Sequence, residues 1–259
     1  MAEPTVLTED RGPIRIVTLN RPERRNAIDL VLRVELADAF EAASDAPNVR
    51  VVVLTGAGGA FCSGGDISTM RRMGPDETVP PRAEAANRVI RAIWNSDKPV
   101  LAAVEGAAFG AGVSLAAACD RVVASENAVF GTAFTGVGLA GDMGLFSSLP
   151  ARVGPAVARQ LMLLPRRLNG IEAQELGLVD EVVPAGAALD RAFADAEQIV
   201  AAPPLALREM KRLWRRWAAD PFDVLEFETQ AQTRLFDSAD FAEGIDAFHA
   251  KRAPRFRGV

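Results

Sequence analysis

The chain has 259 residues, which is enough for one large domain or for one domain with an appendage. Hydrophobic residues make up 49% of it, as is usual in a protein with a packed core. The formal net charge of −5, from 29 basic and 34 acidic side chains, argues against a general nucleic-acid binder. With two cysteines and one histidine, we expect neither a disulfide framework nor a Cys/His metal site.

The N-terminal segment, residues 1–10, lacks the basic and apolar regions of a secretory signal peptide. No apolar run reaches the ~18 residues that a membrane-spanning helix needs. Both cysteines, Cys62 and Cys119, have apolar or small neighbours, which suits a reducing compartment. We therefore expect a cytoplasmic protein with no membrane partner.

The first part of the chain alternates strand-type apolar runs with helical patterns. Residues 14–20 alternate in polarity and predict a strand, and Asp29 is placed to cap a helix over 30–44. Continuous apolar runs at 50–55 and 99–106 predict strands that are buried on both faces. Further helices or short strands are expected at residues 67–73, 82–96, 112–119, 120–125 and 128–132.

The second part of the chain is mainly helical in pattern. From about residue 142 onward only residues 179–183 predict a strand, and residues 186–250 predict a series of helices. This order indicates an α/β fold, with a core over residues 1–195 and a C-terminal helical region over residues 196–259. The large apolar side chains of that region serve either to cover the core or to contact other subunits.

Two glycine-rich turns, each preceded by a buried strand, are the most informative feature of the sequence. They lie in RVVVLTGAGGAFCSGGDI (residues 50–67) and KPVLAAVEGAAFGAGVSLA (residues 98–116). Such turns can direct backbone N–H groups at an anion. The first lacks the third glycine of a dinucleotide fingerprint, and no Walker lysine follows either turn. One such turn is explained by tight packing alone, whereas two at the ends of two buried strands favour a site with paired donors.

Five segments of the chain resemble the crotonase family, the enoyl-CoA hydratases and isomerases. They are LNRPERRNAI (19–28), GAGGAFCSGGDI (56–67), KPVLAAVEGAAFGAGVSLAAACD (98–120), GVGLAGDMG (136–144) and EGIDAFHAKRAPRF (243–256). The resemblance implies a spiral core of repeated ββα units, and a C-terminal helical region that forms a homotrimer or a hexamer. It also implies acyl-CoA thioester substrates, with coenzyme A as part of the substrate and no permanently bound cofactor.

The same resemblance implies an oxyanion hole formed by the backbone N–H groups of Gly65 and Ala111. Ala111 stands where many members of the family have glycine, a change that leaves the N–H group in place. Removing a proton next to a thioester creates an enolate-like oxyanion. Donors already directed at that oxygen stabilise the transition state more than the ground state.

The resemblance also implies a set of residues that contact CoA or substrate. They are Arg25, Ala27, Gly64, Asp66, Ile67, Phe134 and Lys251. Arg21, Arg24 and Arg25 crowd one turn, which suits CoA phosphates, although an ordinary solvated turn has the same composition. Asp66 is equally placed to cap the helix that follows it. Lys251 resembles the tail lysine that approaches the CoA phosphate, in its own or a neighbouring subunit.

Hydratases of this family use two glutamates, and both positions differ in this chain. Ser114 stands at the first and Phe134 at the second. Hydration benefits from two acid/base groups, and phenylalanine cannot carry a proton. One carboxylate, Asp142, follows Phe134 by eight residues, where several branches of the family have a catalytic aspartate. The pattern is closest to the 1,2-epoxyphenylacetyl-CoA isomerases, and an apolar pocket would raise the pKa of Asp142.

The leading hypothesis is a one-base isomerase in which Asp142 removes a proton and returns it at another carbon. The first alternative is an enoyl-CoA hydratase that uses Asp142 and water. A covalent aspartyl mechanism is disfavoured because no histidine precedes His249 to act as a base. Outside enzymes, the alternative is an inactive paralogue that binds CoA thioesters.

Overall fold

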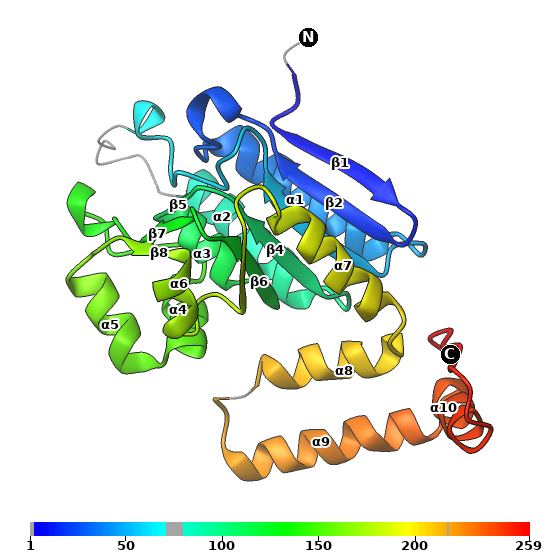
Figure 1. Ribbon diagram of the computed structural model, residues 1–259. Helices are drawn as coiled ribbons and strands as arrows, with labels where there is room; N and C mark the ends of the chain where they lie inside the picture. Colours follow the sequence, from blue (N-terminus) through cyan, green and yellow to red (C-terminus); the bar gives the residue numbers. More distant parts are fainter. Residues whose placement is uncertain (1–2, 71–79, 217) are drawn as a thin grey trace.

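The computed structural model describes residues 3–70, 80–216 and 218–259. A six-stranded sheet forms its centre, in strand order β1-β2-β3-β4-β6-β9 (Figure 1). Its strands are β1 (Val6–Arg11), β2 (Ile14–Leu19), β3 (Val51–Gly56), β4 (Val100–Val104), β6 (Arg121–Ser125) and β9 (Glu181–Val183). The pair β1–β2 is antiparallel and the other neighbouring pairs are parallel. β3 and β4 are buried on both faces, which explains their continuous apolar sequences.

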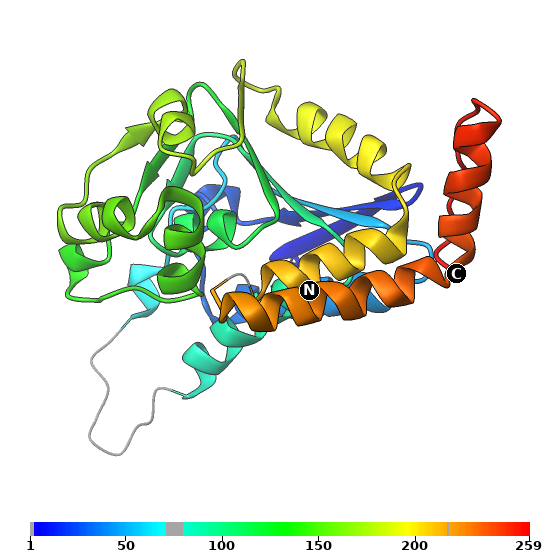
Figure 2. The same ribbon diagram turned by 90° about the horizontal axis from the view of Figure 1, so that it is seen from below.

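Helices cover both faces of this sheet (Figures 1 and 2). One face packs against α7 (Ala188–Val200), whose three buried alanines, spaced four residues apart, bring the helix close to the strands. The opposite face packs against α1 (Leu30–Asp45) and α2 (Pro80–Asn95), which also contact each other. Asp29 caps α1 by accepting a hydrogen bond from the Leu32 N–H at 2.8 Å, as the sequence predicted.

A smaller sheet and a group of short helices lie at one end of the large sheet (Figure 1). The small sheet has the strand order β5-β7-β8. Its strands are β5 (Ala107–Phe109), β7 (Val129–Gly131) and β8 (Leu168–Asn169). The α-helices here are α3 (Ala111–Ala117), α4 (Leu145–Val153), α5 (Pro155–Leu163) and α6 (Gly170–Glu175). The 3-10 turns of the core are η1 (Pro22–Arg24), η2 (Ile67–Thr69) and η3 (Thr135–Val137).

Three further helices form a C-terminal region. They are α8 (Pro204–Trp214), α9 (Pro221–Phe236) and α10 (Ala239–His249). In this region α8 and α9 lie side by side, and α10 lies at the end away from the small sheet (Figures 1 and 2). Several of their large apolar side chains are exposed: Trp214, Phe222, Leu225, Phe236, Phe241, Ile245 and Phe248. The α/β class with a C-terminal helical region is confirmed. The expected boundary at residue 195 falls inside α7, and the division into two units stays a prediction.

Besides the strands β1 and β8, which the sequence did not predict, two elements of the core differ from the sequence-based expectations. The strand expected over residues 99–106 ends at Val104, because Gly106 has φ +53° and turns the chain into the separate strand β5. A Cβ at Gly106 would lie 2.4 Å from the Gly59 oxygen, so glycine is required there. Of the helix expected over 67–73, residues 67–69 form η2, and its last three residues lie outside the described residues.

No helix within the described residues has the length and apolar character needed to cross a membrane. In the same residues, no three His, Cys, Asp or Glu side chains are grouped closely enough to hold a metal ion.

Candidate active site

The first glycine-rich turn runs along β5 and reaches the start of α3. The Cys62 N–H donates to the Ala107 oxygen at 2.8 Å, and the Phe109 N–H donates to the Cys62 oxygen at 2.9 Å. Gly64 has φ +100°, and a Cβ there would lie 2.8 Å from the Phe109 oxygen. A Cβ at Gly112 would lie 2.3 Å from the Cys62 oxygen. Glycine at these two positions therefore lets the two turns meet.

The Gly65 and Ala111 N–H groups lie where the two turns meet. The two chain neighbours of Gly65 both bond to Ile28. The Ile28 N–H donates to the Gly64 oxygen at 2.7 Å, and the Asp66 N–H donates to the Ile28 oxygen at 2.9 Å. Ala111 is the first residue of α3, where N–H groups have no partner within the helix. Within the described part of the chain, neither of these two N–H groups donates a hydrogen bond. Both N–H groups are therefore compatible with the predicted oxyanion hole.

The two positions at which the resemblance implies glutamate in hydratases carry side chains without a base. Ser114 is fully buried, and its hydroxyl donates to the Gly110 oxygen of the preceding turn at 3.4 Å. Phe134 is half-buried and packs against the main core. Its ring lies close to the second turn, 3.9 Å from where a Cβ of Gly110 would be. Neither residue supplies a group that would exchange a proton at neutral pH.

Asp142 is a carboxylate in the segment that leads to α4. Its side chain is 44% exposed, and its Oδ2 atom lies 3.4 Å from Nη2 of Arg33. The protein around the carboxyl removes part of its hydration and so raises the pKa of Asp142 above the ordinary 3.8. The positive charges of Arg33 and Arg82 oppose this rise. The direction agrees with the sequence-based expectation, and the raised pKa suits a general base.

The partner of Asp142, Arg33, was missed from the sequence. It lies on α1, and only 5% of its side chain is exposed. Its Nη1 donates to the Arg82 oxygen at 3.3 Å, and its Nε has no partner among the described residues. A signal exists in the sequence, because Arg33 shares the i, i+3, i+4, i+7 spacing of the buried Leu36, Ala37 and Phe40. A charged residue within an apolar stripe indicates a buried charge.

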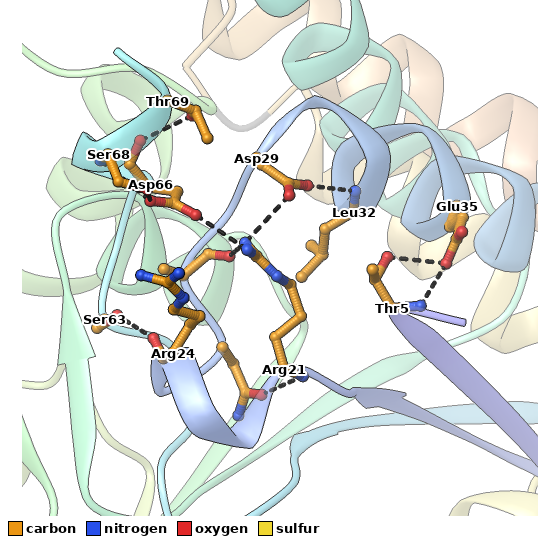
Figure 3. A network of polar contacts seen from close by, with 12 residues as sticks. Thr5, Arg21, Arg24, Asp29, Leu32, Glu35, Ser63, Asp66, Ser68 and Thr69 are labelled. Carbon is orange, nitrogen blue, oxygen red and sulfur yellow. Dashed lines mark hydrogen bonds and ion pairs between the residues drawn. The ribbon is translucent and has the colours of Figure 1, made fainter. Parts of the chain in front are cut away.

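The arginine-rich turn contributes fewer free arginines than its sequence suggests (Figure 3). Arg21 points inward, where its Nη1 lies 3.2 Å from the Asp29 carboxylate and its Nη2 lies 3.0 Å from that of Asp66. Asp66 also caps η2 by accepting from the Ser68 N–H at 3.1 Å. Arg21 and Asp66 are therefore structural partners, whereas Arg24 and Arg25 are exposed.

Most of the expected CoA contacts lie together at one edge of the protein. The Arg25 oxygen accepts from the Ser63 N–H at 2.9 Å, which joins the arginine-rich turn to the first glycine-rich turn. Ala27 is 9% exposed and Ile67 is 65% exposed beside this junction. Lys251 follows α10, at the opposite end of the molecule from η2 (Figures 1 and 2). A single chain therefore does not bring Lys251 to the other residues.

Comparison with known proteins gives matches along the whole chain. The family model described as Enoyl-CoA hydratase/isomerase matches residues 9–259. A probable enoyl-CoA hydratase of Rhodobacter capsulatus is 38% identical over 260 residues, covering 100% of both chains. A carnitinyl-CoA dehydratase of Salmonella typhi is 34% identical over 265 residues, again covering 100% of both.

Solved structures agree with these sequence matches. The crystal structure of an enoyl-CoA hydratase from Polaromonas sp. JS666 has a TM-score of 0.91 at 38% identity, covering 97% of this chain and 99% of the other. That of an enoyl-CoA hydratase from Bacillus anthracis has a TM-score of 0.93 at 31% identity, covering 98% and 100%. The expected crotonase fold is confirmed. The chain thus belongs to the enoyl-CoA hydratase/isomerase family of enzymes.

Proposed function

We propose that this protein is an acyl-CoA isomerase of the one-base type, with Asp142 as the base. The observation that carries the proposal is the contrast among three positions. Asp142 is a carboxylate with a raised pKa, whereas Ser114 and Phe134 occupy the glutamate positions of the family hydratases. One base can move a proton between two carbons, but adding water across a double bond benefits from two acid/base groups.

The proposed reaction is a proton transfer in two steps. The Asp142 carboxylate takes a proton from a carbon of the acyl group, and the electron pair of that C–H bond moves into the thioester carbonyl. The resulting enolate oxygen accepts hydrogen bonds from the Gly65 and Ala111 N–H groups, one from each glycine-rich turn. The electrons then return to form a new C–H bond at another carbon, with the proton from Asp142. In this scheme a double bond moves and no water is consumed; a ring isomerase would use the same base and oxyanion hole, with the breaking and re-forming of ring bonds in addition.

Coenzyme A enters this proposal as part of the substrate, without a permanently bound cofactor. Arg25, Ala27, Gly64, Asp66 and Ile67 would line its nucleotide and pantetheine at the junction of the first two turns, with Phe134 beside the acyl group. Lys251 would come from a neighbouring subunit of a homotrimer or hexamer. The exposed apolar side chains of α8–α10 support such an assembly, because large exposed apolar patches mark interaction surfaces.

The test follows solvent deuterium into a panel of acyl-CoAs by mass spectrometry. Wild-type protein should exchange deuterium into its substrate, and Asp142→Asn should reduce this exchange by about 10²-fold or more, because removing a general base costs about 10² to 10⁴. The matched control is Asp38→Asn, which removes a carboxylate that pairs with Arg88 at 2.6 Å on the surface. Asp142→Asn with nearly the exchange of Asp38→Asn would refute the assignment.

The second candidate is an enoyl-CoA hydratase, favoured by the names of relatives such as the Rhodobacter capsulatus protein. In that case Asp142 activates water, and the product is a 3-hydroxyacyl-CoA that contains oxygen from labelled water. The isomerase proposal predicts a product of unchanged mass in undeuterated water. An inactive paralogue would bind acyl-CoA without any deuterium exchange.

A further inference from the structure

Arg33 is a buried cation with an incomplete set of hydrogen bonds. A guanidinium group has five N–H donors. Among the described residues, Arg33 uses one towards the Arg82 oxygen at 3.3 Å and one towards Asp142 at 3.4 Å. Both distances are long for hydrogen bonds of this kind. Its buried Nε has no acceptor within residues 3–70, 80–216 and 218–259, and burial lowers the pKa of the group.

Two other poorly exposed cations of the chain have closer partners than Arg33 has, and the buried Nε of Arg208 lies 3.5 Å from Oε1 of Glu209. The ammonium of Lys211 donates to the Lys98 oxygen at 2.9 Å and also pairs with Asp120. The guanidinium of Arg21 contacts two carboxylates and a backbone oxygen. A buried charge without such partners is costly, and packing alone would be served better by an apolar side chain. The unused donors of Arg33 therefore point to a ligand.

The position of Arg33 indicates which ligand this would be. Arg33 lies in the first turn of α1, which begins two residues after Ile28, the residue that pairs with Gly65 of the first glycine-rich turn. Arg82, whose backbone oxygen accepts from Arg33, directs its own guanidinium at Thr69 of η2. Arg33 thus lies between the first glycine-rich turn and Asp142. An acyl group held there by its thioester would bring its far end to this side chain.

We propose that Arg33 donates a hydrogen bond to an oxygen on the acyl group, beyond the carbons between which Asp142 moves the proton. The substrates are then acyl-CoAs whose acyl group carries a carboxylate or a carbonyl oxygen, not plain hydrocarbon chains. This proposal rests on the proposed function for the place of the acyl group. A site built around a buried donor rejects the analogue that lacks the acceptor, because the donor then stays unpaired.

The test is equilibrium binding, measured by calorimetry, of three saturated acyl-CoAs that carry no double bond to move. Glutaryl-CoA supplies a carboxylate, 5-oxohexanoyl-CoA a carbonyl oxygen and hexanoyl-CoA only hydrocarbon. Wild-type protein should bind at least one of the first two about tenfold or more tighter than hexanoyl-CoA, the amount expected for a hydrogen bond to a charged group. Preference for glutaryl-CoA alone identifies an anion site, and preference for both a general acceptor site. Equal binding of all three, or tighter binding of hexanoyl-CoA, would overturn the proposal.

Variants assign the preference to Arg33. In Arg33→Met the ratio of the affinity for the preferred oxygen-containing acyl-CoA to that for hexanoyl-CoA should fall to about one. The control Arg88→Met, which removes a surface arginine from α2, should keep the wild-type ratio. Arg33→Gln keeps donors without the charge, so glutaryl-CoA should lose its advantage there even if Arg33→Met does not fold. A ratio unchanged in Arg33→Gln and Arg33→Met would assign the preference elsewhere. The binding test does not depend on the role of Asp142. Deuterium exchange without a preference for oxygen-containing acyl groups would refute the Arg33 proposal alone. A preference for these acyl groups without deuterium exchange would refute the isomerase proposal alone.

Discussion

Alanine at Gly64 should separate the geometry of the oxyanion hole from the stability of the fold. The new Cβ would lie 2.8 Å from the Phe109 oxygen, closer than a Cβ atom is found in proteins. Phe109 leads within two residues to Ala111, so relief of this contact moves one of the two proposed donors away from the other. The matched control is Gly59→Ala in the same turn, where φ is +73° and a Cβ meets nothing within 4 Å.

The two substitutions share one cost and differ in another. Each places an alanine at positive φ, which costs roughly 1–2 kcal/mol and should lower both melting temperatures. Only Gly64→Ala also displaces the segment that carries Ala111. Loss of one oxyanion donor costs about 10²–10³ in kcat, or ~3–4 kcal/mol of transition-state stabilisation. We therefore expect kcat to fall by about 10²-fold in Gly64→Ala and to change little in Gly59→Ala.

For each variant the assay measures the initial rate of deuterium exchange into an acyl-CoA at saturating concentration. The melting temperature of the same variant is measured by circular dichroism. Exchange should be measured well below both melting temperatures, so that unfolding does not contribute. Equal kcat values in the two variants would show that the contact between Gly64 and Phe109 does not hold the donors in place. The assignment of Gly65 and Ala111 to one oxyanion hole would then lose its structural basis.

Three further predictions concern titratable groups. The rate of deuterium exchange should rise with pH as Asp142 loses its proton, with the midpoint of the rise above pH 3.8. Arg33→Met should move this midpoint to higher pH, because the Arg33 charge lowers the pKa of Asp142. The bond from Ser68, followed by Arg21, lowers the pKa of Asp66 in the folded protein. The melting temperature of Asp66→Asn should therefore lie below that of the wild type at pH 7. This difference should vanish as the pH falls through the lowered pKa of Asp66. Burial raises the pKa of both Cys62 and Cys119 to about 12, so a thiol reagent at pH 8 should label them only after unfolding; rapid labelling of folded protein would contradict this.

Local patterns in the sequence were sufficient to predict most of the elements. The cap at Asp29, the helix that follows it and the buried strands β3 and β4 depend on residues that are neighbours in the chain. The pairings that close each sheet were harder to predict. β1 is exposed along most of its length and β8 has two residues, so neither has an apolar run that identifies it. Their partners, not their own sequences, make them strands.

In the candidate site, too, some features could be predicted from the sequence and others could not. Backbone features were predictable, because glycines at positive φ, such as Gly64, are required by the turn itself. Side-chain direction was not. Arg21 belongs to a basic turn that suits a phosphate, yet its guanidinium turns inward to Asp29 and Asp66, which compete for the same donors at fixed positions. Composition alone cannot distinguish these two uses of an arginine, since both require a nearby anion.

Arg33 and Asp142 show what only the folded chain reveals. They are 109 positions apart in sequence, and each alone has an ordinary explanation as a surface helix residue or a helix-capping carboxylate. Together they place the proposed base and a donor side by side. The Arg33 charge limits how far burial raises the pKa of Asp142, and its Nε has no acceptor among the described residues, which supports the proposed contact with a substrate oxygen. Replacing Arg33 should therefore change the pH profile and the substrate preference at once, a joint effect that a residue serving only to pack α1 would not produce.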